Sequence, residues 1–504
     1  MNGASAAYCG IRVSGTIAMP LNFFSSKRAA VVAASVFFLG STAWGQSLEA
    51  RLRAMLNRNE VNDAAVGLHV VEVTTKGPVE LFGHQTNLPL GPASNTKLLT
   101  TAAALETYGP KATFKTQLYK VGEDLLLVGG GDPALGDVTL AEARGEKITT
   151  PFEKFAAALK AAGVTSYRHL IIDDRVFDRE FVHPNWPVDQ LLSWYSAPIG
   201  GLNLNANCLD WRPIVNTNGR IGIELIPPTT YASVTIKATR GAKNEVWLWR
   251  PPTANRFEMR GTVARTATDA ESVAIYEPGL WTGTVLRDVL NDSGITSTGE
   301  VHRIADDAVV TNATLVATAE TKLLDVIHRA NRNSVNMMTE GLCKRLGFDA
   351  TRKPGTWASG TAAIEKYVRG LGIEAEQVSL DDGSGLSNKN RASARAFTTV
   401  LAHVAIQPGG DAFVDSLARP GEDGTLRRRF AGLPVAKAVH AKTGHIRGVS
   451  ALSGYIDVPE RPADGEPFKG RRFAFSILVN KYQGNVNPWQ DAVCQEIFKW
   501  AGGK

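Results

Sequence analysis

Cysteine is scarce in this chain. The 504 residues include four cysteines, Cys9, Cys208, Cys343 and Cys494. Three remain once Cys9 is set aside with the N-terminal segment discussed below, and an odd number does not form a disulfide framework. One pair could still form, and each cysteine could equally be a small buried apolar side chain. The composition therefore argues against a small disulfide-stabilised fold.

Several catalytic signatures are also missing. The nine histidines are scattered, and the sequence contains neither H-E-x-x-H nor a paired C-x-x-C. The glycines of "VGGGDP" lack the spacing of a phosphate-binding loop, and no G-x-S-x-G elbow of a Ser-His-Asp hydrolase occurs. We therefore expect neither a metal nor an organic cofactor.

A long apolar run occurs near the N-terminus, from 29 to 40, directly after Lys27 and Arg28. The small residues Ala43 and Gly45 follow it with the spacing of a signal-peptidase site, so residues 1–45 are interpreted as a signal peptide, with Met19 as an alternative start. The run is shorter than the roughly 20 residues that span a bilayer. An uncleaved anchor is the alternative. We expect an exported protein of the periplasm or cell-wall space, with peripheral membrane association at most.

The charge balance is close to neutral. The formal net charge of +6 falls to +3 without residues 1–45, which carry Arg12, Lys27 and Arg28 and no acid. This bias is too small to indicate a nucleic-acid partner. The length favours two to four domains.

The two ends of the mature chain share one pattern of predicted helices and strands. A helical stripe over 48–56 precedes strand-like runs at 66–73 and 79–84, and further strand-like runs at 449–458 and 471–480 precede a helix at 489–501. Residues 46–111 and 316–504 are therefore predicted to form one domain with a sheet flanked by helices. Residues 112–315 are rich in short strands and turns, and are predicted to be a β-rich insertion of more than one subdomain. The fold class is α/β (α+β).

The stretch "ASNTKLLTTAAALETYG" contains two residues that could take part in catalysis. Ser94 and Lys97 lie three residues apart at the start of an apolar helical run, so both side chains share one face. A serine hydroxyl becomes a nucleophile when a base takes its proton, and a lysine of lowered pKa can be that base. A helix-capping serine beside a solvated lysine is the alternative.

Two later stretches supply complementary groups. "ANRNSVNMMTE" holds Ser334, which can relay a proton, and Asn336, which can hold a substrate amide. "VHAKTGHIRG" holds Lys442 and Thr443, which can fix a carboxylate, and Gly444, against which a substrate backbone can lie.

In the order S-x-x-K, S-x-N, K-T-G these stretches match the set found in penicillin-binding proteins and class A β-lactamases. The chain resembles the class C low-molecular-mass penicillin-binding proteins, which are D-alanyl-D-alanine carboxypeptidases that often also act as endopeptidases. The resemblance extends through "VGGGDPAL", "SAPIGGLNLNANC" and "DDGSGLSNKNRAS". It implies a transpeptidase/β-lactamase-like domain with an antiparallel sheet.

The resemblance also implies roles and partners. Ser94 is the nucleophile, Lys97 its base and Ser334 the proton relay, and the backbone N–H groups of Ser94 and His445 form the oxyanion hole. His445 departs from the Ser or Thr that usually follows K-T-G in this family. Asp173 is expected to recognise the amine of a diamino acid in the stem peptide. Peptidoglycan stem peptides are the implied substrates, and β-lactams are the implied covalent inhibitors.

Two other functions stay open at this stage, a β-lactamase and a non-catalytic wall-binding protein. The complete motif set argues against the second. The E-x-x-L-N loop of class A β-lactamases is missing, because Arg53, Ile199, Gly201 and Arg287 stand at the glutamate position before each Leu-Asn pair.

Overall fold

The computed structural model describes residues 46–459 and 470–503; the expected signal peptide lies outside them. Both ends of this region form one five-stranded sheet in the order β19-β20-β21-β1-β2, with every neighbouring pair antiparallel. Its strands are β1 (Ala65–Val73), β2 (Val79–His84), β19 (Val439–Ile446), β20 (Val449–Pro459) and β21 (Gly470–Asn480). The predicted fold class, an antiparallel sheet flanked by helices, is confirmed.

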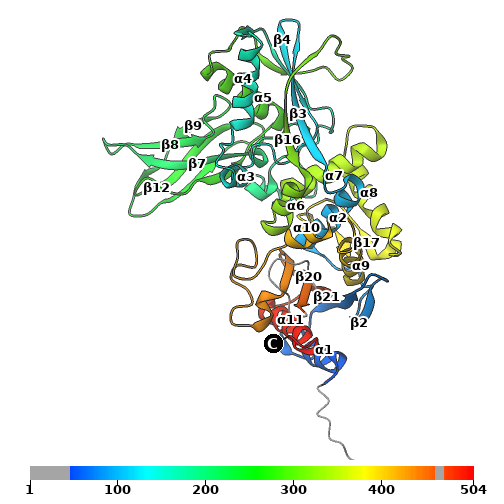
Figure 1. Cartoon of the computed structure of the whole chain (residues 1–504). Helices are drawn as coiled ribbons and strands as arrows, with labels where there is room; N and C mark the ends of the chain where they lie inside the picture. The colour runs from blue at the N-terminus through cyan, green and yellow to red at the C-terminus, as the bar shows by residue number, and fades with distance from the viewer. Residues whose placement is uncertain (1–45, 460–469, 504) are drawn as a thin grey trace, which may run out of the picture. The chain divides into compact units, whose positions relative to one another are not determined.

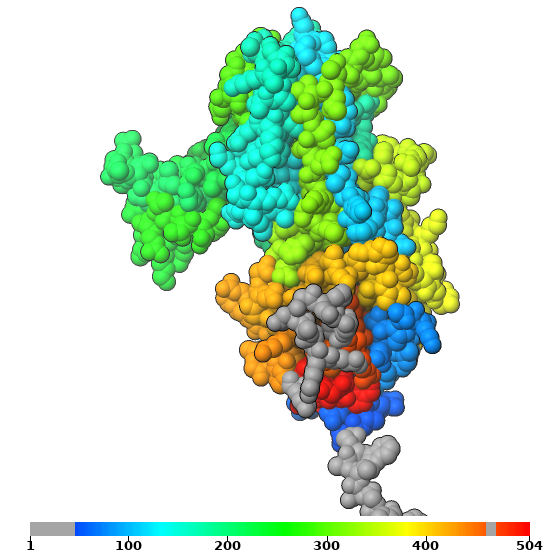
Figure 2. Space-filling view, in the orientation of Figure 1, coloured from blue at the N-terminus to red at the C-terminus, as the bar shows by residue number. Residues whose placement is uncertain are grey.

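Helices cover both faces of this sheet because its strands alternate apolar side chains between the two faces. Val70 and Phe475 pack with α1 (Leu48–Leu56) and α11 (Asn487–Trp500) in one core cluster. Val71 and Leu478 pack in a second cluster with α2 (Thr96–Tyr108) and α9 (Ala394–Val404). Figure 1 shows these layers, and Figure 2 shows the C-terminal strands and helix beside the blue N-terminal segment.

Further helices pack around α2. They are α6 (Leu323–Arg332), α7 (Asn336–Thr351), α8 (Trp357–Gly370) and α10 (Gly410–Asp415). The short pair β17 (Val378–Ser379) and β18 (Arg391–Ala392) frames a loop over 380–390 that returns toward α2. Buried apolar side chains of α2, α6, α7, α8 and α9 belong to one core, so α2, which carries Lys97, and α7, which begins at Asn336, are packed together.

The insertion contains several sheets of its own. The first has the order β15-β6-β4-β3-β16, with β14 and β5 paired beside it, and two smaller sheets join β13-β7-β8 and β10-β12-β11 with β9. Their strands are β3 (Thr113–Val121), β4 (Asp124–Gly129), β5 (Ser166–Tyr167), β6 (Leu170–Asp173), β7 (Cys208–Val215), β8 (Ile221–Ile226), β9 (Ser233–Ile236), β10 (Thr239–Arg240), β11 (Glu245–Trp249), β12 (Arg256–Val263), β13 (Glu271–Ala274), β14 (Thr296–Ser297), β15 (Val301–Arg303) and β16 (Thr314–Lys322). The helices α3 (Val138–Ala143), α4 (Thr150–Ala161) and α5 (Pro278–Asp292) accompany them.

The insertion returns to the catalytic helices through β16. This strand pairs with β3 from Thr314 opposite Lys120 to Lys322 opposite Thr113, and α6 begins at the next residue. The predicted boundary between 315 and 316 falls near the start of β16, and the division into domains stays a prediction.

Two general expectations can be compared with the described residues. Cys208, Cys343 and Cys494 are all buried and free. No helix within 46–459 or 470–503 has the length and apolarity needed to cross a membrane.

Candidate active site

Ser94 lies in a short 3₁₀ turn, Ala93–Asn95, that leads directly into α2. Ala93 has φ 46, in the left-handed region, so the chain bends sharply just before the serine. The Ser94 side chain is half-exposed, whereas its neighbours Ala93 and Asn95 are buried. The local backbone therefore presents the hydroxyl at the surface of an otherwise packed helix start.

Lys97 is fully buried on the first turn of α2, and its Nζ lies 3.1 Å from Ser94 Oγ. Its other contacts are Asn336 Oδ1 at 2.6 Å and the Ser384 carbonyl oxygen at 2.8 Å. Burial lowers the pKa of Lys97, against the negative charges of Glu340 and Asp382, which raise it. A lysine of lowered pKa at hydrogen-bond distance from the serine is the arrangement that nucleophilic catalysis requires.

Ser334 and Lys442 form a second pair. Ser334 lies in the turn between α6 and α7 with φ 63, a conformation that a serine rarely adopts, and its Oγ accepts a hydrogen bond of 2.9 Å from Lys442 Nζ. Lys442 is also fully buried on β19, and its Nζ donates to the Thr443 carbonyl at 2.8 Å. Burial, with a smaller effect from the charge of Lys97, holds the pKa of Lys442 well below its usual value.

Asn336 is the first residue of α7, and both polar atoms of its side-chain amide are hydrogen-bonded. Its Oδ1 accepts from Lys97, and its Nδ2 donates to the Tyr195 carbonyl at 2.7 Å. The insertion therefore helps to orient a residue of the S-x-N motif.

The strand β19 forms the edge of the central sheet beside Ser94. A Cβ on Gly444 would lie 2.5 Å from the Pro92 carbonyl oxygen, so glycine is required for the close approach of this edge to the turn of Ser94. Ala441 N–H donates to the Ala418 carbonyl on the side away from β20. The two-residue period of a strand directs the N–H of His445 to the same open edge.

A cleft of about 860 Å³ lies over these groups. It is lined by Ser94, Asn185, Pro187, Gln190, Trp194, Tyr195, Asn333, Ser334, Asn336, Gly385, Leu386, Asn388, Thr425, His445, Ile446 and Arg447. Lys97 and Lys442 are buried behind Ser94 and Ser334, and Thr443 is half-buried on β19. The structure thus brings together the serines, lysines and asparagine of all three motifs.

Comparison with known proteins identifies the family. The model of the D-Ala-D-Ala carboxypeptidase 3 (S13) family matches residues 48–498. The chain belongs to this family. Membership in the S13 family confirms the resemblance inferred from the motifs and the prediction of a serine-type carboxypeptidase.

Individual relatives agree with this S13 assignment. The chain is 31% identical to a D-alanyl-D-alanine carboxypeptidase of Actinomadura sp. (strain R39) over 89% of its own length and 84% of that protein. It is 24% identical to the D-alanyl-D-alanine carboxypeptidase DacB of Haemophilus influenzae over 77% of this chain and 80% of the relative. The crystal structure of penicillin-binding protein 4 (dacB) from H. influenzae has a TM-score of 0.68 at 22% identity, covering 88% of this chain and 97% of that one, and supports the fold.

One expected site residue of this S13 protein lies elsewhere. Asp173 is the last residue of β6, it does not line the described cleft, and its carboxylate accepts from Arg175 at 2.9 Å and 2.7 Å. The predicted role of Asp173 in recognising a substrate amine stays a prediction.

Sequence reasoning missed two parts of the cleft. The first is the insertion segment 185–195, which contributes Trp194 and Tyr195. The second is Arg447, an exposed residue after β19. The glycine at 448 indicates a tight turn directly after the K-T-G strand, and this turn could have placed Arg447 beside the site. The 185–195 segment has no periodic pattern from which its position could be predicted. Among the described residues no group of three or more His, Cys, Asp or Glu is arranged to hold a metal ion.

Proposed function

We propose that the chain hydrolyses the terminal D-alanyl-D-alanine bond of peptidoglycan stem peptides through an acyl-enzyme on Ser94. The observation that carries this proposal is the meeting of Ser94, Lys97, Asn336 and the Ser334–Lys442 pair at one cleft. The fold, the three motifs and the family support it together.

The first half-reaction is acylation. Lys97 accepts the hydroxyl proton of Ser94, and Ser94 Oγ forms a bond to the carbonyl carbon between the two D-alanines. The backbone N–H groups of Ser94 and His445 stabilise the oxyanion. Ser334, beside Lys442, gives its proton to the leaving nitrogen as the C–N bond breaks and takes up the proton that Lys97 accepted from Ser94. D-alanine departs, and Lys97 is again a neutral amine.

The second half-reaction uses water. With D-alanine gone, a water molecule occupies its place, loses a proton to Lys97 and attacks the ester carbonyl. Ser94 Oγ leaves and regains its proton, so the enzyme returns to its starting state.

Recognition of the terminal carboxylate involves polar side chains at the β19 side of the cleft. We assign this role to Lys442 and Thr443, as their motif suggests, and to Arg447, whose side chain is exposed in the cleft. Trp194 and Tyr195 also line the cleft, and their aromatic rings offer the stem peptide an apolar surface. Cleavage of D-alanyl cross-links by the same acyl transfer, an endopeptidase activity, is part of this proposal.

The place of action follows from the substrate. Peptidoglycan lies outside the cytoplasmic membrane, so the protein acts in the periplasm or cell-wall space after removal of residues 1–45. N-terminal sequencing of the exported protein is expected to give Gln46 or a close neighbour, and an exported form that retained residues before Ala29 would contradict the signal-peptide assignment.

The enzymatic proposal is tested by incubating a stem pentapeptide ending in D-alanyl-D-alanine with the purified mature protein. We expect one equivalent of D-alanine released per peptide, and none with Ser94→Ala. Release by Ser94→Ala at the wild-type rate, or no release by the folded wild type, would contradict the proposal.

A further inference from the structure

The loop over 380–390 follows the N-terminal part of α2 and the turn before it for three consecutive residues. The Gly383 carbonyl accepts from Thr100 Oγ1 at 2.7 Å, and the Ser384 carbonyl accepts from Lys97 Nζ at 2.8 Å. Gly385 has φ 85, and a Cβ there would lie 1.8 Å from the Ala93 carbonyl oxygen. The loop is therefore in contact with the base and with the turn that carries the nucleophile.

The Ser384 carbonyl matters for the direction of the Lys97 lone pair. A neutral amine has two N–H bonds and one lone pair. Asn336 Oδ1 at 2.6 Å and the Ser384 carbonyl at 2.8 Å accept both N–H bonds, which leaves the lone pair directed at Ser94 Oγ, 3.1 Å away. A misplaced Ser384 carbonyl would free the amine to rotate away from the serine.

Asp382 holds this loop in place through four hydrogen bonds to one buried carboxylate. Its Oδ1 accepts from Gly385 N–H at 2.7 Å and Asn390 Nδ2 at 2.8 Å. Its Oδ2 accepts from Ser387 N–H at 2.6 Å and Trp186 Nε1 at 2.9 Å. The side chain is 0% exposed, so no water replaces a lost partner without a rearrangement of the loop.

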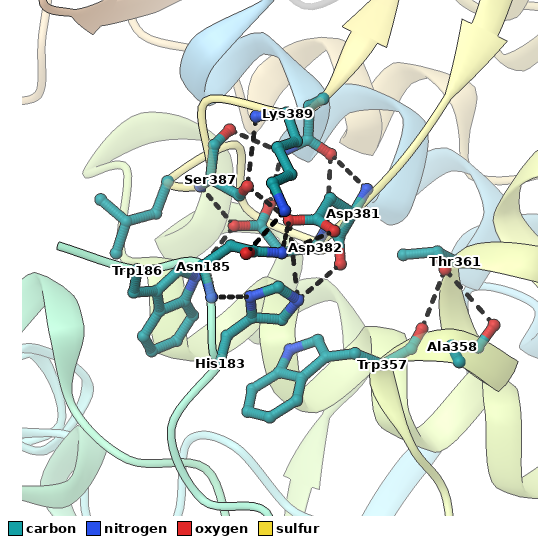
Figure 3. A network of polar contacts seen from close by, with 12 residues as sticks. His183, Asn185, Trp186, Trp357, Ala358, Thr361, Asp381, Asp382, Ser387 and Lys389 are labelled. Carbon is teal, nitrogen blue, oxygen red and sulfur yellow. Dashed lines mark hydrogen bonds and ion pairs between the residues drawn. The ribbon is translucent and has the colours of Figure 1, made fainter. Parts of the chain in front are cut away.

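The fourth donor, Trp186, belongs to the insertion. Figure 3 shows Trp186 together with His183 and Asn185, two other residues of the insertion, in contact with this loop. Nearby, His183 Nε2–H donates to the Asp381 carbonyl at 2.8 Å, since His183 Nδ1 accepts from Asn185 N–H. Asn185 Nδ2 donates to both carboxylate oxygens of Asp381. The insertion thereby fixes the outer side of the same loop whose inner side contacts Lys97.

We propose that Asp382, assisted by Trp186 of the insertion, is a positioning residue for acylation, which holds the Ser384 carbonyl against Lys97 so that the amine faces Ser94. The inference rests on the proposed acyl-enzyme at Ser94. It gives the insertion a part in the chemistry without placing any of its side chains on the reacting atoms.

The negative charge of Asp382 should affect the pH dependence of acylation, which a residue that only packs would not change. The carboxyl groups near Lys97 are Asp382 on the loop and Glu340 on α7, and the nearby amine is that of Lys442 on β19. The charge of Asp382 raises the pKa of Lys97 against the effect of burial. Loss of that charge lowers the pKa of Lys97 further, so the rise of the acylation rate with pH moves to lower pH.

The test is the rate of acylation by a penicillin, per molecule of protein that can be acylated, as a function of pH in the wild type and in Asp382→Asn. Asparagine has one acceptor oxygen for four donors. We expect the plateau rate to fall roughly 10- to 100-fold, as for a displaced catalytic group, and the midpoint of the rise to move to lower pH. An unchanged rate and an unchanged midpoint would overturn the proposal.

A matched control separates this role from the general cost of removing a buried acid. Asp210, buried in the insertion, accepts from Asn205 Nδ2 and Ser272 Oγ and does not line the cleft. Asp210→Asn is expected to lower stability and to keep the wild-type acylation rate and midpoint. An equal effect on acylation in both variants would overturn the proposal.

Trp186→Phe provides a second variant if Asp382→Asn does not fold. It removes one donor and retains the negative charge, so the plateau rate should fall roughly 3- to 10-fold, for the loss of one hydrogen bond to a charged group, with an unchanged midpoint. A rate within twofold of wild type would overturn the proposal. Failure of the folded wild type to be acylated at all would instead contradict the proposed function, on which this inference depends.

Discussion

At the scale of single residues, the site depends on two buried lysines in different surroundings. Lys97 Nζ has three oxygen neighbours, from Ser94, Asn336 and Ser384. An ammonium can donate to all three, and a neutral amine can donate to two of them and direct its lone pair at Ser94. Lys442 contacts Ser334 and its own neighbouring carbonyl. The charge of Lys97 adds to burial in lowering the pKa of Lys442, since like charges repel in a site shielded from water.

The first residue-scale prediction is a pH dependence. Below its pKa the Lys97 ammonium has no lone pair for the Ser94 proton, so the acylation rate should rise with pH as the lysine deprotonates. Because burial lowers the pKa of Lys97, the midpoint should lie below the usual lysine pKa of about 10.4. Stopped-flow acylation by a penicillin checks this in the wild type, with Lys97→Ala as the variant that lacks the rise. A rate independent of pH would mean that another group is the base.

The second residue-scale prediction concerns Arg447. Arg447→Ala should raise KM for a D-alanyl-D-alanine peptide about fivefold, the ratio for about 1 kcal/mol in a partly exposed ion pair. A peptide with an amidated C-terminus should bind equally to both proteins because it lacks the carboxylate. Arg240→Ala, an exposed arginine of the insertion, is the control that should change neither peptide's KM. An equal loss for both peptides would show that Arg447 does not read the carboxylate.

At the scale of elements, the turn between α6 and α7 holds Ser334 in a left-handed backbone conformation. This conformation costs about 1 kcal/mol or more for a residue with a Cβ, and it is retained because it places the hydroxyl beside Lys442. Ser334→Gly and Ser334→Ala both remove the hydroxyl, and both should lose D-alanine release.

The two variants should differ in stability. Glycine accepts the positive φ without strain, whereas alanine keeps the cost, so Ser334→Gly should be more stable than Ser334→Ala by about 1 kcal/mol. Urea unfolding monitored by fluorescence measures the difference. A Ser334→Ala protein as stable as Ser334→Gly would show that the turn stores no strain.

The same scale shows what the sequence could predict. The strands at 66–73 and 471–480 were recognisable because each is a short and largely apolar run, rich in β-branched residues at 66–73. They pair as β1 and β21. The motifs were recognisable because their spacing is short and local. The wall formed by 185–195 was not, since its 3₁₀ turns lack a period and its position depends on long-range contacts such as Trp186 with Asp382.

At the scale of the whole molecule, the cleft wall lacks a carboxylate. None of the described lining residues is Asp or Glu, and Glu340 is fully buried behind Lys97, where burial raises its pKa. Rapid hydrolysis of a penicilloyl-enzyme needs a base placed for water, and the leaving amine of a penicillin stays tethered where water would enter. A peptide releases its D-alanine and clears that space.

We therefore expect slow penicillin turnover beside ready release of D-alanine from peptides. Acyl-enzyme lifetimes with penicillin should be on the order of minutes or more, a barrier of about 20 kcal/mol. Loss of bound label after removal of free drug, compared with D-alanine release by the same preparation, measures both. Faster hydrolysis of penicillin than of peptide would favour a β-lactamase.

The central claim is that Ser94 is the residue that becomes acylated. The most direct measurement is peptide mapping by mass spectrometry after brief incubation with a penicillin. Trypsin should give a peptide over 77–97, which ends at Lys97 and contains Ser94 as its single serine. We expect the mass of one penicilloyl group on this peptide and none in Ser94→Ala. A label on any other peptide, or an unlabelled and folded wild type, would contradict the account.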